Sequence, residues 1–305
     1  MSSPTPQGVI HDLGYRPFTG RRQSTAAVAA SLYVTSLRHA FGIGRSAKSK
    51  VVPFLIAGLM LIPALVLAGL LVQLNKMSLS DQGDLIAPLA NYFGYPYWTQ
   101  LLITIFTAAQ APVLFARDLR YRTIVLYFAR PLSRTTYVLV RLAALSTAIF
   151  AIVAVPLTIW YAAALTTHVS KSEHTGHYFA ALAGVLVLAL VLASFSGLVA
   201  ALTTRAGLAV AAIIVGLLLT SGIVTSLLGL ACTNHQSTLG YLAAMFTPFT
   251  VVAELISGLF HQPTPTSSLQ HPSAGWTIGF VVAALVWVCA CATALLLRIR
   301  KAASL

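Results

Sequence analysis

Residues 116–137 read ARDLRYRTIVLYFARPLSRTTY, and this stretch decides how the chain is organised. It is short and strongly basic, and it lies between two long apolar runs, residues 97–116 and 137–165. A helix of about 20 residues rises about 30 Å, which matches the hydrocarbon thickness of a membrane. We therefore interpret residues 116–137, called the elbow below, as the connection between two membrane-spanning helices.

The elbow has the pattern of a short helix followed by a turn. Asp118 suits the first turn of a helix, where a carboxylate interacts favourably with free backbone N–H groups. Pro131 ends that helix, because the residue before a proline disfavours helical dihedral angles. Ser133 can then cap the helix that follows. This pattern predicts a short helix lying across the ends of the two spans.

The elbow is also more apolar than an ordinary basic loop needs to be. Its hydrophobic positions are Leu119, Tyr121, Ile124, Val125 and Phe128. A solvated loop that only carries positive charge would need no ordered apolar side chains, whereas a binding surface would. The sequence therefore predicts that the elbow contacts a partner.

Composition points to a polytopic membrane protein. The 305-residue chain is 58% hydrophobic and only 8% charged, whereas soluble domains carry about 25% charged residues. Six apolar runs are long enough to span a bilayer, and together they predict an all-α fold with six transmembrane helices. These runs are residues 51–74, 97–116, 137–165, 178–202, 208–230 and 276–297. The charged residue within them is Arg141, which we expect to extend back to the headgroups.

The distribution of basic residues predicts the topology. The net charge is +13, from 19 Lys and Arg against 6 Asp and Glu, and the positive charges cluster beside apolar runs. This favours anionic lipid and the positive-inside rule over nucleic acid. With six spans, both termini lie on the cytoplasmic side with the elbow, and of the basic residues only Lys76 and Lys171 lie outside. We therefore expect a transmembrane domain at 51–297 and a cytoplasmic tail at 298–305.

A seventh apolar stretch, residues 239–260, is predicted not to span. Pro248 interrupts it and Glu254 lies within it, and a carboxylate in mid-bilayer costs about 2.5–3.5 kcal/mol. A seventh span would also move the basic C-terminus to the opposite face. We expect a helical hairpin that dips in from the outer face, with Glu254 and Pro248 as candidate residues of an exit path.

Residues 1–50 are predicted to be a cytoplasmic tail that ends in an interfacial helix. From Ser24 to about Gly42, apolar residues recur every three or four positions, and polar residues occupy the other side. The expected apolar face consists of Ala26, Ala30, Tyr33, Leu37 and Phe41.

The chain has few residues that suit catalysis or metal binding. His168, Glu173, His174 and His177 lie in one outer loop and could hold a divalent metal, but such a mixture is also typical of a solvated loop. We predict no metal site, no catalytic residue and no cofactor on this chain.

The elbow resembles that of permease subunits of the ABC-2 type exporter family. The resemblance rests on the charged turn Arg117–Arg120, the apolar helix from Leu126, and the motif Arg130-Pro131-Leu132-Ser133-Arg134. The opening HDLGYR, from His11, resembles a subgroup common in high-GC Gram-positive bacteria. The chain departs from the family at Tyr121-Arg122-Thr123, where members often have an acidic residue and a Gly-Thr pair.

The resemblance implies a multi-pass subunit of the bacterial cytoplasmic membrane that exports a hydrophobic or amphiphilic substrate. Two separate ATPase subunits would bind ATP and Mg, and a second permease copy or homologue would complete the transporter. The elbow would act as the coupling helix that contacts the ATPase. By this resemblance the coupling residues are Asp118, Leu119, Arg122, Ile124, Val125, Phe128, Arg130, Pro131 and Arg134.

Two other classes of function were weighed. An ion-coupled secondary transporter or channel usually needs ionisable side chains or inverted repeats within its spans, and the runs lack Asp, Glu and His. A membrane-embedded enzyme would need a catalytic cluster at the interface, and no such motif is evident.

Overall fold

A computed structural model describes residues 23–76, 91–121, 123–124, 127, 132–167, 171–203, 205–261 and 271–302. Within these ranges every regular element is a helix. The elements are α1 (Thr25–Ala40), α2 (Lys48–Lys76), α4 (Gly94–Trp98), α5 (Gln100–Leu114), α6 (Ala116–Arg120), α8 (Arg134–Leu165), α9 (Lys171–Thr203), α10 (Ala206–Thr233), α11 (Ser237–Ala244), α12 (Pro248–Phe260) and α13 (Ala274–Ala302). The predicted all-α class is confirmed.

Six helical segments of the described chain are long and apolar enough to cross a membrane. They run from Lys48 to Lys76, Gln100 to Arg120, Arg134 to Leu165, His174 to Thr203, Ala206 to Thr233 and Ala274 to Ala302. Each matches one of the six predicted runs, so the multi-pass membrane character is confirmed. The prolines within α2 and α8, Pro53, Pro63 and Pro156, do not interrupt the helices.

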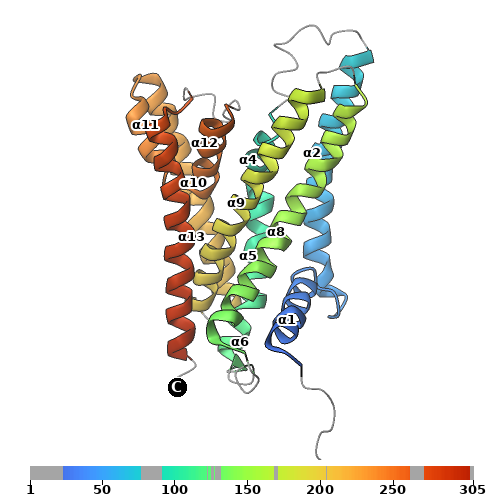
Figure 1. Ribbon diagram of the computed structural model, residues 1–305, viewed down its shortest axis with the longest axis vertical. Coiled ribbons are helices and arrows are strands. Elements are labelled where there is room, and N and C mark those ends of the chain that lie inside the picture. Colours follow the sequence, from blue (N-terminus) through green and yellow to red (C-terminus); the bar gives the residue numbers. More distant parts are fainter. Residues whose placement is uncertain are drawn as a thin grey trace, which may run out of the picture.

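Helices α5, α8 and α9 form the centre of the bundle. Most of each central window is buried, whereas less than a third of the corresponding window is buried in α2, α10 and α13. Figure 1 shows α8 and α9 side by side in the middle of the bundle, with α2 on one side and α10 and α13 on the other. The exposed faces of the outer helices carry leucine, isoleucine and valine, as expected of surfaces that contact lipid tails.

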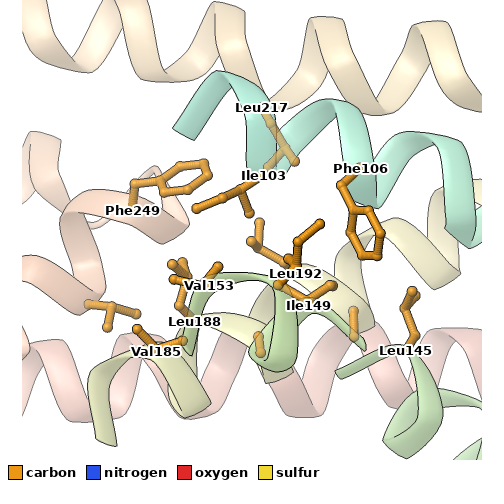
Figure 2. Packing of buried hydrophobic residues seen from close by; sticks show 14 of the residues in the cluster. Ile103, Phe106, Leu145, Ile149, Val153, Val185, Leu188, Leu192, Leu217 and Phe249 are labelled. Carbon is orange, nitrogen blue, oxygen red and sulfur yellow. The ribbon is translucent and has the colours of Figure 1, made fainter. Parts of the chain in front are cut away.

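The core between the central helices is apolar and closely packed. Ile103 and Phe106 of α5 meet Ile149 and Val153 of α8 and Leu192 of α9 (Figure 2). Small residues allow close approach of other elements. A Cβ at Gly184 of α9 would come within 2.7 Å of Ile256 of α12 and of Phe93, so only glycine fits there.

The two ends of the bundle are built from different elements. One end, called the basic end below, contains α1, α6, the first turns of α2 and α8, and the C-terminal turn of α13 (Figure 1). The other, called the hairpin end, contains α4, α11 and α12. The basic residues of the described spans and of α1 lie at the basic end, apart from Lys76 and Lys171.

The second and fourth predicted runs differ from the structure in ways that affect the site and its surroundings. The second run is divided, because α4 ends at Trp98 and α5 ends at Leu114, where Phe115 leads into α6. Helix α9 begins at Lys171 rather than at 178, so part of the expected outer loop is helical. Contacts of its first turns with residues far away in sequence explain this earlier start, and they are described below.

Helix α1 is present as predicted, with Ser24 as its N-cap, and the predicted apolar face is confirmed in part, because Leu37 and Phe41 pack on the core. Ala26 and Ala30 are exposed, while Ser36 and Ala40 are buried. The helix packs on α8 and α5 of the same chain, and the Tyr33 hydroxyl donates a hydrogen bond of 2.9 Å to Thr147 Oγ1. The orientation of α1 is therefore set by the bundle and not by amphipathicity alone.

The expected helical hairpin between the last two spans consists of α11 and α12. Thr247 caps α12, and Pro248 occupies the first turn, where its missing N–H group is not needed. Because α12 has 13 residues, it is shorter than a span and packs on α9 and α13 instead. The position of this hairpin relative to a membrane is considered under the proposed function.

Candidate functional site

The candidate site lies where the elbow meets the first turns of α8. Helix α6 continues from α5 and carries Asp118 in its first turn. The Ser133 hydroxyl caps α8 by accepting the Thr136 N–H at 3.0 Å, as predicted. Tyr137 and Arg141 are four residues apart on α8, so they lie on one face of the helix and both reach Asp118.

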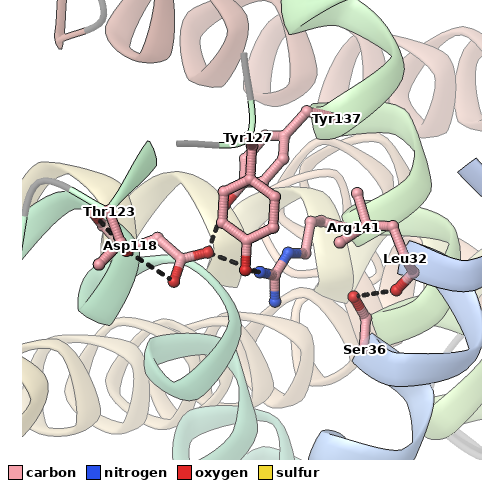
Figure 3. A network of polar contacts seen from close by, with 7 residues as sticks. All are labelled: Leu32, Ser36, Asp118, Thr123, Tyr127, Tyr137 and Arg141. Carbon is pink, nitrogen blue, oxygen red and sulfur yellow. Dashed lines mark hydrogen bonds and ion pairs between the residues drawn. The ribbon is translucent and has the colours of Figure 1, made fainter. Parts of the chain in front are cut away.

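Asp118 is the centre of a polar network (Figure 3). Its Oδ2 accepts hydrogen bonds of 2.6 Å from the Tyr137 hydroxyl and from Arg141 Nη2. The Thr123 hydroxyl lies 3.4 Å from both Oδ1 and the backbone oxygen of Asp118. One carboxylate therefore joins α6, the following segment of the elbow and α8.

Arg141 is enclosed on several sides. Its guanidinium donates a second hydrogen bond, of 3.2 Å, to the Tyr127 hydroxyl. The guanidinium carbon lies 5.6 Å from the ring centre of Tyr127 and 5.3 Å from that of Tyr137, which are distances of cation–π interactions. The side chain is only 5% exposed and that of Asp118 is 16% exposed. Arg141 therefore turns toward Asp118 and the two tyrosines, a pairing that the sequence analysis did not predict.

This arrangement is suited to holding the elbow rigidly against the bundle. Removing one partner of a buried ion pair leaves an uncompensated charge and costs about 3–5 kcal/mol. The carboxylate and the guanidinium already bind each other, and the two tyrosines act as hydrogen-bond partners and as aromatic walls. These contacts connect the elbow to α8. They do not form the pair of a nucleophile and a neighbouring base that covalent catalysis requires.

The predicted coupling residues fall into three groups. Leu119 is half-buried and packs on the core, and Ile124 is 2% exposed, so both support the elbow from within. Arg134 is exposed at the start of α8. Arg122, Val125, Phe128, Arg130 and Pro131 lie outside the described residues. Tyr121, which is 64% exposed, is the large apolar side chain that the described part of the elbow presents outward.

The candidate exit-path residues lie inside the hairpin end. Glu254 is fully buried in α12, and Pro248 is buried at the start of that helix. Burial raises the pKa of the Tyr241 hydroxyl on α11, and the negative charge of Glu254 raises it further. In this structure both candidates therefore belong to the packing of α12 and not to an open surface.

The hairpin end contains a cluster of aromatic residues that the sequence analysis missed. Tyr92 stacks near Trp160 of α8, with ring centres 4.8 Å apart, and its hydroxyl shares a hydrogen bond of 3.0 Å with His174 Nδ1. Tyr161 and Tyr178 lie in parallel at 4.1 Å. These contacts anchor the first turns of α9 and explain its early start. The signal in the sequence was the density of aromatic residues in 91–98 and 160–161.

The expected outer-loop histidines are not brought together as a metal site in the described part of the chain. His174 is buried and bonded to Tyr92, while His168 lies outside the described residues. Within the described ranges, no group of three or more His, Cys, Asp or Glu side chains is placed to hold a metal ion.

No protein-family model matches this chain, and a search of curated proteins gives no match either.

Proposed function

We propose that the chain is the membrane-spanning permease subunit of an ATP-binding cassette exporter. In this proposal, it moves a hydrophobic or amphiphilic substrate outward with energy from separate ATPase subunits. The observation that carries the proposal is the Asp118 network, which fixes a basic, partly apolar elbow to the central helices α5 and α8. A force applied to such an elbow would reach the core of the bundle directly.

The charge distribution supports a topology with the basic end in the cytoplasm. Arg117, Arg120 and Arg134 of the elbow region are exposed at that end, as are Arg300 and Lys301 of α13. Positive charge is retained on the cytoplasmic side of bacterial membranes. Both termini and the elbow would then be cytoplasmic, and α11 and α12 would form a non-spanning hairpin at the outer face of the bacterial cytoplasmic membrane.

The proposed partners are two cytoplasmic ATPase subunits and a second permease copy or homologue. The ATPases would bind ATP and Mg, and this chain would need no cofactor and no catalytic residue of its own. The contact surface in the described residues would centre on Arg120 and Tyr121, whose side chains are exposed next to each other. An arginine and an aromatic side chain are typical of residues that contribute most to a protein interface.

Co-purification tests the proposal. Affinity purification of the intact protein in mild detergent should recover an ATPase, and the variant Tyr121→Asp should reduce that recovery about tenfold or more, since interface anchors contribute 2 kcal/mol or more. The matched control is Leu242→Asp, which places the same charge on an exposed residue of α11 at the other end. Recovery that is equal for both variants, or no ATPase with the unaltered chain, would contradict the proposal.

A further inference from the structure

A pocket of about 200 Å³ lies between α1, the elbow and α8 at the basic end. It is lined on three sides by side chains that can donate hydrogen bonds. They are Ser31, Thr35, Ser36, His39, Tyr127 and Arg141. The rest of its wall consists of Gln23 and of the apolar residues Val28, Leu32 and Leu132. A pocket of this size is large enough for several water molecules or for one small polar group.

Arg141 is the buried, positively charged side chain in the wall of this pocket. Its Nη2 donates to Asp118 and to Tyr127, as described above. Its Nε is buried and has no acceptor among the described residues. Arg141 is one of the side chains that line the pocket, so an acceptor bound there would lie beside a guanidinium group. In Figure 3 the guanidinium lies between the elbow and α1, next to Ser36 on the α1 side.

The charges near His39, which lines the pocket, are mainly positive. Burial lowers the pKa of His39, and the positive charges of nearby guanidinium groups lower it further. Those groups are Arg141, Arg45 and Arg117. The carboxylate of Asp118 acts in the opposite direction and is the smallest of these contributions. At His39, which lines the pocket, the positive charges of these three arginines therefore outweigh the negative charge of Asp118.

We propose that this pocket binds a phosphate group, either in the headgroup of an anionic lipid or as free inorganic phosphate. Phosphate oxygens are strong acceptors that match the guanidinium of Arg141, and the hydroxyl groups of Ser31 and Thr35 add neutral donors at the rim. The pocket is lined by α1, Tyr127 and α8 at the basic end, and in the proposed topology this end would lie beside the headgroups of the cytoplasmic leaflet. This site goes beyond the proposed transport function and does not depend on it.

The occupant would add a second connection between α1 and α8, which already pack on each other. The Asp118 network ties the elbow to α8, while a phosphate bound at Arg141 would add α1 to the same group of contacts. Binding should therefore stabilise the folded protein in proportion to the ligand concentration relative to its dissociation constant.

Native mass spectrometry of the full chain tests the site. Protein released from nanodiscs that contain equal amounts of phosphatidylglycerol and phosphatidylcholine should retain phosphatidylglycerol preferentially if the source is a lipid. The variant with Ser31→Leu and Thr35→Leu fills the rim and should reduce retention about tenfold, through lost hydrogen bonds and lost space. Ala30→Leu is the control, because Ala30 is exposed on the same helix and is not part of the pocket wall.

A second arm distinguishes free phosphate from lipid. Inorganic phosphate is titrated into delipidated protein in neutral detergent, and the midpoint of thermal unfolding is recorded. A rise that Ser31→Leu with Thr35→Leu abolishes and that Ala30→Leu retains, without preference for phosphatidylglycerol, would support a soluble phosphate ligand. The proposal is overturned if neither probe binds, or if the pocket-filling variant and the control bind alike.

Discussion

The basic end and the hairpin end of this bundle are held together by different forces. At the basic end, a carboxylate and a guanidinium pair beneath the elbow, with two tyrosines around them. At the hairpin end, Tyr92, Trp160 and Tyr178 pack as neutral rings, with hydrogen bonds at their edges. An ion pair specifies one geometry and connects distant segments, whereas stacked rings fill space. The contrast suggests a connecting role for the first end and a structural role for the second.

The largest expected effect is at the hairpin end. Trp160→Ala removes a fully buried indole that contacts Tyr92 and Tyr95, and such truncations cost about 3–5 kcal/mol. Trp160→Phe is the matched control. The Trp160 Nε1 is buried without a partner among the described residues, so its loss should cost much less. Thermal unfolding in detergent, followed by circular dichroism, measures both, and equal losses would contradict the packing role.

The second effect is a loss of stability at the basic end. We expect the cost of replacing Asp118 to depend on whether Arg141 is present. Asp118→Ala leaves Arg141 buried without its counter-ion and should destabilise the protein by about 3 kcal/mol. Adding Arg141→Leu should restore part of this loss, because the uncompensated charge is gone. A double-mutant cycle measures the coupling. If the two losses simply add, the ion pair does not hold the elbow.

The sequence predicts features that depend on neighbouring residues, but not contacts between residues that are far apart in the chain. Runs of apolar residues, the break at Pro248 and the cap at Ser133 are local signals, and the structure bears them out. The pairing of Asp118 with Arg141 is not local, and a lone arginine near the start of a span looks the same whether it turns outward or inward. Only the tertiary structure, which brings Asp118 of α6 within reach of Arg141 of α8, distinguishes the two.

The exact face that α1 buries and the start of α9 also depend on contacts between distant residues. Amphipathicity places Ala26 and Ala30 on the same face as Leu37 and Phe41, but only the second pair packs on the core. The first turn of α9 is polar in sequence and becomes helical because Tyr92 and Tyr161 supply partners to His174 and Thr175.

The third effect is a loss of stability at alkaline pH, and it is expected at the hairpin end. Burial raises the pKa of the Tyr92 hydroxyl well above its ordinary value of about 10, and the nearby Tyr161 contributes in the same direction. The unfolded chain therefore loses this proton at a lower pH than the folded chain, so stability is fully present below about pH 10 and falls as the pH rises above it. Tyr92→Phe should reduce this alkaline loss, as measured by unfolding midpoints between pH 9 and 11. An unchanged pH dependence would contradict the burial of this hydroxyl in the folded protein.

The smallest effect is expected from the cap of α8. Ser133→Ala removes the acceptor for the Thr136 N–H and should cost about 1 kcal/mol. Ser24→Ala, at the N-cap of α1, is a suitable comparison, because the Ser24 hydroxyl accepts the Ala27 N–H at 3.3 Å. Unfolding midpoints check both, and a loss at Ser133 as large as that of Asp118→Ala would show that the cap, and not the ion pair, secures the elbow.

The sidedness of the elbow tests the central claim most directly. Cys232, Cys289 and Cys291 are replaced by serine, and Tyr121→Cys introduces one thiol at an exposed position of the elbow. A membrane-impermeant maleimide is then applied to intact cells and to permeabilised cells. The account predicts labelling only after permeabilisation, because the basic end would face the cytoplasm in the proposed topology. Labelling of Tyr121→Cys in intact, sealed cells would contradict both the topology and the proposed contact with an ATPase.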